Sequence, residues 1–271
     1  MERIILIETS TALCSVALAE DGIIVDYRES SAPKAHASLT AVFIQDMLAE
    51  RGLSVTDCNA VCVSMGPGSY TGLRVGVSTA KGLCFGAKVP LIAVGTLDTL
   101  VAQAGLRIAP PVQNADEEGT SVMSGEVEAS AGYKYIVPMI DARRMEVYTA
   151  VFKKNDLGNT DHIISSETGN QDREVSNFGQ ITETAPMIID ENSFADILAN
   201  GPVLFIGDGA GKCADVIQHP NAHFHQCHPK ASSMLSPALT EFRSGNFRDV
   251  AYFEPFYLKE FVATVSKKKL F

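Results

Sequence analysis

The sequence has no excess of positive charge and no long hydrophobic run. Its 271 residues include 22 Lys and Arg against 32 Asp and Glu, which gives a formal net charge of −10. A chain with this balance repels a phosphate backbone as a whole, so a role with nucleic acid must use a local patch or a partner. No apolar run reaches the roughly 18 to 20 residues that cross a bilayer. We therefore expect neither a membrane span nor a signal peptide, and a cytoplasmic location.

Little in the composition points to disorder or to disulfide crosslinks. The chain is 46% hydrophobic and 20% charged, so it is expected to form one large domain or two of ordinary size. The six cysteines lie mostly inside apolar segments, and a core of this size needs no crosslinks. We expect reduced thiols that pack as small hydrophobic side chains, at Cys14, Cys58, Cys62, Cys84, Cys213 and Cys227.

The order of strand-like and helix-like segments predicts an α/β lobe at residues 1–106. Three antiparallel strands are expected at 3–8, 14–19 and 23–28, with Asp21-Gly22 as a hairpin turn. Further strands alternate with helices, which indicates a mixed sheet with parallel members. These later elements are strands at 60–64 and 90–94 and helices at 37–51, 71–87 and 96–104.

Residues 107–132 are acidic, rich in small residues and without periodicity, so we interpret them as a mobile insertion or linker. Residues 133–271 are predicted to form a second lobe. Its expected elements are strands at 135–140, 146–152, 162–165 and 203–206, and a helix from about 211. The final helix, 232–242, either packs on the second lobe or crosses back to the first.

The segment Gly66–Leu83 is the most distinctive part of the sequence. A helical projection places Arg74, Ser78 and Lys81 on one narrow polar stripe, while apolar residues cover most of the rest. Small residues at positions 72, 76 and 80 permit close helix packing. The helix is either internal to the core or part of a seam with another chain. In the second case the predicted partner interface is Leu39, Phe43, Met47, Gly72, Leu73, Gly76, Val77 and Ala80.

Two turns are candidate phosphate-binding sites. One follows the first strand at Glu8–Thr11, where a plain polar turn is the alternative. The other, Gly207–Lys212, precedes a helix, where free amides could receive an anion. It is not a Walker A loop, because Ile206 stands where that motif has Gly and Cys213 replaces its Ser or Thr. The candidate residues for weak binding of ATP or ADP with Mg²⁺ are Glu8, Ser10, Thr11, Gly207, Asp208 and Gly209.

Potential metal ligands are densest near the end of the chain. Three of them alternate along a possible strand and would share one face, which is usable for zinc or copper. A histidine-rich edge without metal is the simpler interpretation, and we adopt it. This cluster consists of His219, His223, His225, Cys227 and His228. His36 stands alone before a helix and is expected to cap or pack rather than to bind a metal.

Several motifs occur together in this sequence: Ile7-Glu8-Thr9-Ser10, Cys14–Leu18, His36, Gly66–Arg74, Asp141-Ala142-Arg143, Glu146-Val147-Tyr148 and Pro255–Lys259. In combination they resemble the TsaB (YeaZ) family, accessory subunits of the bacterial machinery that installs threonylcarbamoyl on the adenosine beside the tRNA anticodon. The resemblance implies a two-lobed actin-like, sugar-kinase-like (ribonuclease H-like) fold. It also implies a homodimer, a heterodimer with the catalytic subunit TsaD, assembly with the ATPase TsaE, and tRNA contact only through the complex.

The departure from the catalytic relative is informative. TsaD-like chains carry a His-x-x-x-His metal pair after the glycine-rich helix, and the resemblance aligns Thr96 and Leu100 with it. Because these side chains are poor metal ligands, we predict no catalytic residue, no metal and no intrinsic cofactor. The expected function is a non-catalytic scaffolding subunit. The alternative is an ATP-dependent phosphotransferase or ATPase in which Glu8 organises magnesium and the turn at Gly207 holds adenosine.

Overall fold

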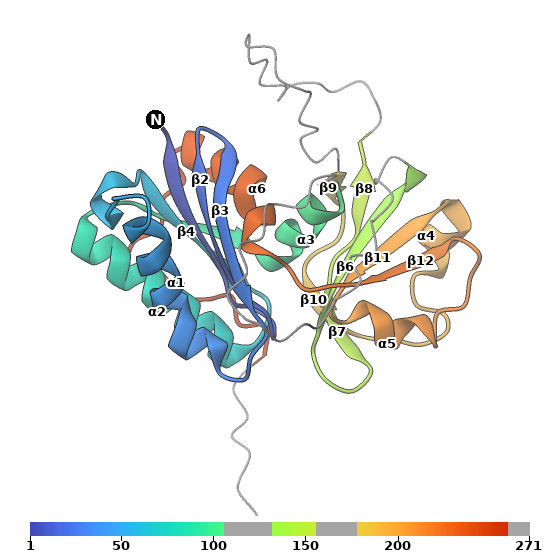
Figure 1. The fold of residues 1–271 in the computed structure, drawn as a ribbon. Coiled ribbons are helices and arrows are strands. Elements are labelled where there is room, and N and C mark those ends of the chain that lie inside the picture. The colour runs from blue at the N-terminus through green and yellow to red at the C-terminus, as the bar shows by residue number, and fades with distance from the viewer. Residues whose placement is uncertain (106–131, 156–177, 260–271) are drawn as a thin grey trace, which may run out of the picture.

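A computed structural model describes residues 1–105, 132–155 and 178–259. Within these ranges the chain forms two sheets, each flanked by helices, which lie side by side (Figure 1). None of the described helices is both long enough and apolar enough to cross a bilayer. The predicted insertion at 107–132, apart from Gly132, and the predicted strand at 162–165 lie outside the described residues.

The first sheet has the strand order β3-β2-β1-β4-β5. Strands β1 (Arg3–Glu8), β2 (Cys14–Glu20) and β3 (Ile23–Ser30) form an antiparallel meander, while β4 (Ala60–Gly66) and β5 (Leu91–Gly95) run parallel to β1. The Asp21-Gly22 turn has positive φ at both residues, 47° and 76°, as a tight two-residue hairpin requires. The predicted mixed sheet is therefore present.

Helices cover both faces of this sheet. On one face, α1 (Ala35–Ala49) and α2 (Tyr70–Ala87) pack side by side over a core that includes Ile5, Val16 and Val61, with the 3₁₀ turn η1 (Val55–Asp57) beside them. On the other face lie η3 (Ala231–Met234) and α6 (Leu235–Arg243), which pack on Ile4, Leu6 and Ile92. The end of the described chain therefore belongs to the first lobe in space (Figure 1).

The second sheet has the order β10-β7-β6-β11-β12, with β8 and β9 attached to β6. Its strands are β6 (Tyr135–Asp141), β7 (Glu146–Thr149), β8 (Phe152–Lys154), β9 (Phe178–Gln180), β10 (Ala185–Ile188), β11 (Val203–Gly207) and β12 (Ala222–Gln226). The short helices α4 (Ala195–Asn200) and α5 (Ala210–Ala214) belong to the same lobe. The expected strand at 146–152 is divided into β7 and β8, and β9, β10, β12 and α4 were not predicted.

Helix α3 (Thr96–Gly105) joins the two lobes. Its apolar side chains Leu97, Leu100 and Val101 pack against the second sheet, where they meet Ile136 and Leu204. Leu100 is fully buried in this cluster, so its apolar character serves the contact between lobes. With a mixed sheet in each lobe and helices beside both sheets, the predicted two-lobed α/β fold is confirmed.

We expect Leu100→Ala to lower the free energy of unfolding by about 2 to 5 kcal/mol, because it leaves a cavity between α3 and the second sheet. Urea denaturation followed by circular dichroism measures this loss. Ile188→Ala is the matched control, since Ile188 is 74% exposed and its truncation should change stability by less than about 0.5 kcal/mol. An equally small effect of Leu100→Ala would contradict the packing.

Candidate functional site

The turn after β1 is closed by the first turns of α2. Thr9 Oγ1 donates to the carbonyl of Gly72 at 2.9 Å, and the amide of Ser69 donates to the carbonyl of Ser10 at 2.6 Å. The amide of Ser10 is itself used, because it donates to Glu8 Oε1 at 2.7 Å. Glu8, Thr9 and Ser10 are consequently at most 1% exposed. At the predicted phosphate-binding turn, the amide of Ser10 is therefore not free, and Glu8 and Ser10 are covered by the chain.

Glu8 is a carboxyl group in the interior. Burial raises the pKa of Glu8 to about 7, and hydrogen bonding from Ser10 limits that rise. Within the described residues, neither Glu8 Oε2 nor Ser10 Oγ has a hydrogen-bond partner. A buried carboxyl group of this kind is more stable when it is protonated, so Glu8 is poorly suited to organise a cation from this position.

Gly72 and Gly76 of α2 face this turn, and Ala80 packs into the core of the first lobe. A Cβ on Gly72 would lie 2.0 Å from the carbonyl oxygen of Thr9, and one on Gly76 would lie 2.2 Å from Thr9 Oγ1. The predicted partner interface is therefore wrong at six positions, because all six are buried within the single chain: Met47, Gly72, Leu73, Gly76, Val77 and Ala80. Only Leu39 and Phe43 of that set remain partly exposed.

The second predicted turn is also filled by the chain itself. The amide of Gly209 donates to the carbonyl of Met139 at 2.9 Å, and that of Gly211 donates to Gln226 Oε1 at 2.6 Å. A Cβ on Gly207 would lie 2.2 Å from the carbonyl oxygen of Met139, and Gly207 has a φ of 136°. The glycines at 207 and 209 thus permit close packing of β11 on β6, and the amides of Gly209 and Gly211 are not free for phosphate.

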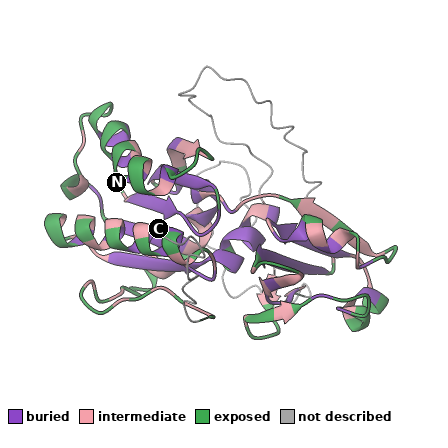
Figure 2. Ribbon diagram, turned by 90° about the horizontal axis from the view of Figure 1, so that it is seen from below, coloured by how far each residue is buried: buried purple, intermediate pink, exposed green. Residues whose placement is uncertain are grey.

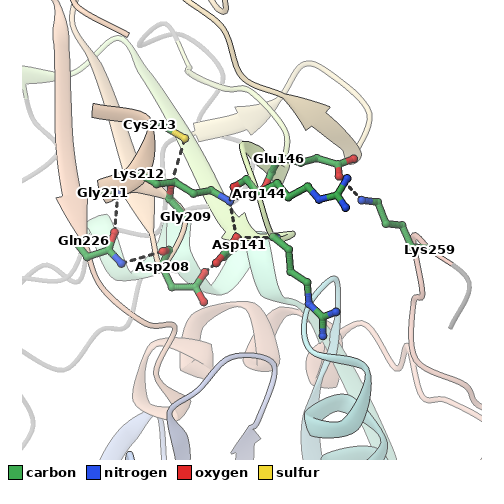
Figure 3. A network of polar contacts seen from close by, with 11 residues as sticks. Asp141, Arg144, Glu146, Asp208, Gly209, Gly211, Lys212, Cys213, Gln226 and Lys259 are labelled. Atoms are coloured by element: carbon green, nitrogen blue, oxygen red, sulfur yellow. Dashed lines mark hydrogen bonds and ion pairs between the residues drawn. The ribbon is translucent and has the colours of Figure 1, made fainter. Parts of the chain in front are cut away.

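A polar network surrounds Lys212 beside this turn (Figure 3). Its ammonium group pairs with Asp141 and donates to the carbonyls of Arg144 and Glu146 at 2.8 and 2.7 Å. The amide of Asp141 donates to Asp208 Oδ1 at 2.9 Å. Burial raises the pKa of Asp208, while hydrogen bonding from Asp141 and the charge of His228 oppose the rise. Lys212 therefore holds the β6–β7 turn together and does not offer its charge to solvent.

His228 connects the two predicted turns. Its Nδ1 lies 3.1 Å from Thr11 Oγ1 and 3.9 Å from Asp208 Oδ2, so the turn after β1 and the turn after β11 meet through one imidazole. His36 Nε2 lies 2.8 Å from the carbonyl oxygen of Thr11, which gives His36 the packing role expected for it. The structure therefore brings Thr11 and Asp208 together, but through contacts within the chain.

The remaining histidines lie on or near β12, at the edge of the second sheet. His223 contacts the ring of Tyr133 at 5.3 Å, and burial lowers the pKa of His225. Cys227 Sγ accepts a hydrogen bond from Gln103 at 3.4 Å. Throughout the described residues, no three His, Cys, Asp or Glu side chains are arranged to hold a metal ion. Of the six cysteines, Cys227 is half-buried and the other five are buried.

The solvent-facing side of the α1–α2 pair carries exposed apolar side chains. Phe85 is 82% exposed and Val42 is 43% exposed. A Cβ at Gly82 or Gly86 would meet nothing within 4 Å, so these exposed positions leave room for another backbone. We call Val42, Ser78, Gly82, Phe85 and Gly86 the outer helical face. Exposed residues line the outer side of these helices in Figure 2. The four-residue spacing of 78, 82 and 86 was the sequence signal for this face.

The two kinds of glycine in α2 should respond oppositely to alanine. Gly82→Ala is expected to stabilise the protein by about 0.5 to 1 kcal/mol, because alanine favours helix and the position is open. Gly72→Ala is expected to destabilise it by about 2 kcal/mol or more, because the new methyl group collides with the Thr9 carbonyl. Thermal and urea unfolding of both variants measure this. Equal effects would contradict the assignment of the buried stripe to intramolecular packing.

Glu8 should make stability depend on pH. Its folded pKa of about 7 exceeds the ordinary value of 4.5, so its favourable contribution is complete below about pH 4.5 and is lost as the pH rises through 7. Across this window the unfolding free energy should fall by about 3 kcal/mol, and Glu8→Gln should remove most of this fall. Urea denaturation between pH 4.5 and 8 measures it, with exposed Glu183→Gln as the matched control. A Glu8→Gln protein with the pH dependence of the parent would refute the prediction.

Comparison with known proteins identifies the relatives of this chain. The family model of TsaD, tRNA N6-adenosine threonylcarbamoyltransferase, matches residues 29–115. The tRNA threonylcarbamoyladenosine biosynthesis protein TsaB of Escherichia coli is 36% identical over 156 residues, which are 58% of this chain and 57% of that protein. The tRNA N6-adenosine threonylcarbamoyltransferase of Nitratidesulfovibrio vulgaris is 29% identical over 54% of this chain and 45% of its own length. These matches thus span about half of each relative.

The fold comparison extends further along the chain. The solved structure of YeaZ from Pseudomonas aeruginosa superposes with a TM-score of 0.70 and covers 95% of this chain and 100% of that one, at 22% identity. This likeness shows the two-lobed fold. The sequence comparisons show that the chain is similar to TsaB proteins over about half of its length and to the TsaD family model over residues 29–115.

Proposed function

We propose that this chain is a non-catalytic scaffolding subunit that binds a TsaD-like threonylcarbamoyltransferase during modification of the tRNA adenosine beside the anticodon. The observation that carries the proposal is the outer helical face, on which Phe85 is 82% exposed beside open Gly82 and Gly86. Exposed apolar groups next to small residues suit close packing of a partner helix. Burying Phe85 alone would contribute about 1.5 to 3 kcal/mol to association.

The interior of the chain supports an accessory role. At the turns after β1 and β11, the amides of Ser10, Gly209 and Gly211 already have partners, and Glu8 is covered by the chain. Thr96 Oγ1 lies 2.9 Å from Ser64 Oγ, and Leu100 packs between the lobes. Both positions, which the resemblance aligns with the metal pair of the catalytic subunit, have structural roles here. These contacts favour the scaffold over the alternative ATP-dependent phosphotransferase or ATPase.

The same face also serves the remaining partners in this proposal. In isolation the chain forms a homodimer through the outer helical face, and the catalytic subunit replaces the second copy because both need the same helices. A TsaE-like ATPase joins the resulting cytoplasmic complex, and tRNA is held within that complex. The chain needs no cofactor of its own for this role.

Charged residues introduced on the outer helical face should prevent assembly of the chain with the catalytic subunit. We expect the parent chain to co-elute with its TsaD-like catalytic subunit at about micromolar concentration and Phe85→Asp/Gly82→Arg to elute separately, since both changes place charges in a buried seam. Size-exclusion chromatography with light scattering measures this and the homodimer in one run. The control is Ile188→Asp, which changes an exposed apolar residue of the second lobe.

Separate elution of the parent chain and the catalytic subunit would overturn the proposed function. Co-elution of the charged double variant would show that the complex forms but does not use the outer helical face. Turnover of Mg-ATP by the isolated chain, abolished by Glu8→Ala, would instead favour the phosphotransferase.

A further inference from the structure

Three arginines stand out because they lack carboxylate partners. Among the described residues, five arginines form ion pairs with Asp or Glu: Arg3, Arg28, Arg51, Arg243 and Arg248. Arg74, Arg143 and Arg144 form none within the same ranges, and all three are exposed. We call these three the arginine cluster. In a chain of net charge −10, where acidic partners are abundant, unpaired arginines are positions where an external anion can bind.

Aromatic side chains and Lys259 connect the members of the arginine cluster. Arg74 lies over the ring of Tyr70 at 5.5 Å, and Tyr70 contacts Tyr257 with ring centroids 4.7 Å apart. Two residues after Tyr257, the ammonium group of Lys259 lies 5.8 Å from the centre of the Tyr148 ring on β7. The cluster therefore extends from the start of α2 across the end of the described chain to the β6–β7 turn.

The charge of Arg143 acts on the same residue, Tyr148. Burial raises the pKa of the Tyr148 hydroxyl, and the charges of Lys259 and Arg143 oppose that rise. In Figure 3 the Arg144 side chain extends past Glu146 toward Lys259. Lys259, from the end of the described chain, and Arg143, from the second lobe, thus both act on Tyr148.

The β6–β7 turn holds its two arginines in a fixed and unfavourable conformation. Arg143 and Arg144 have φ values of 72° and 51°, the left-handed region that residues with a Cβ rarely adopt. The turn is kept there by Lys212, which donates to the carbonyls of Arg144 and Glu146, and by Asp141, which accepts from the amide of Arg143 at 2.8 Å. The backbone is ordered before any ligand arrives, which reduces the entropy lost on binding.

Local charges favour an anion despite the acidic chain. Asp141 is paired with Lys212 and Glu146 with Lys259, which leaves Glu254 as the carboxylate whose charge still acts on Tyr257. Charges elsewhere on the surface are screened beyond about 8 Å at physiological salt. Two carboxylates beside the arginine cluster are therefore already neutralised by lysines.

We propose that the arginine cluster and the Tyr70–Tyr257 pair form an RNA-binding surface, on which the arginines contact phosphates and the half-buried tyrosines stack against an unpaired base. This inference rests on the proposed function, which supplies an RNA substrate to the complex. Guanidinium groups match phosphate oxygens in geometry and charge. Aromatic rings beside them add base stacking, which is the usual combination for single-stranded RNA. The chain thereby contributes directly to holding the tRNA inside the complex.

The test uses the full chain and a fluorescently labelled, unmodified anticodon stem-loop RNA. Fluorescence anisotropy gives its Kd between about 50 and 300 mM KCl, where each lost phosphate contact lowers the salt slope by about 0.7. Arg143→Gln/Arg144→Gln should weaken binding about tenfold at low salt and lower the slope by about 1.4. Lys88→Gln/Lys153→Gln removes the same charge at residues without ion pairs in the described part of the chain, and it should bind like the parent.

The Tyr257→Leu variant distinguishes RNA binding from the binding of a simple anion. It should weaken binding severalfold without changing the salt slope, because stacking does not release counterions. The inference is overturned if the parent chain does not bind the RNA at the lowest salt, if the arginine double variant binds like the parent, or if Tyr257→Leu has no effect.

The arginine variant should still co-elute with the catalytic subunit, since its changes lie outside the outer helical face. Loss of RNA binding with retained co-elution therefore tests this inference separately from the proposed function. If the parent chain fails to co-elute but still binds RNA in the predicted way, the scaffold proposal is contradicted and the RNA-binding surface is supported.

Discussion

The packing of the first turns of α2 on the turn after β1 determines what the rest of the molecule can do. Gly72 and Gly76 let the helix approach so closely that Thr9 hydrogen-bonds to its backbone, and any larger side chain would push the two apart. This contact covers Glu8 and Ser10, and the amide of Ser10 already donates to Glu8 and is not free for a phosphate. It also fixes which face of α2 turns outward, because a helix that uses one side for its own core presents the other to solvent.

Two surfaces follow from this arrangement, and they lie on different parts of the molecule. The outer helical face carries exposed Phe85 and open glycines on the first lobe, which suits a helical partner. The arginine cluster has one member at the start of α2 and two in the β6–β7 turn, linked through Tyr257 and Lys259, and it suits an anionic ligand. Helix α3 packs against the second sheet through Leu97, Leu100 and Val101 and joins the lobes, so a partner on one face and RNA on the other could be held in a defined relative position.

Much of the fold was predictable because the buried strands are continuous apolar runs, and because α1 ends shortly before Gly52. Strands β9 and β10 were missed, since both are short and mostly exposed, and such strands leave no clear pattern. The candidate site was harder. Spacing of four residues marks two stripes on α2, and only the contact with Thr9, 63 residues away from Gly72, decides which is buried. Likewise, no local signal links His228 to Thr11, which are 217 residues apart.

The central proposal is that the catalytic subunit binds the outer helical face, and not the turns after β1 and β11. Alkylation of a Gly82→Cys variant tests it most directly, because five native thiols are buried and burial raises the pKa of the sixth, Cys227, to about 12. The catalytic subunit should slow the reaction of the introduced thiol by about tenfold or more, as expected for a fully covered thiol. An unchanged rate in a mixture whose complex is verified by light scattering would contradict the claim.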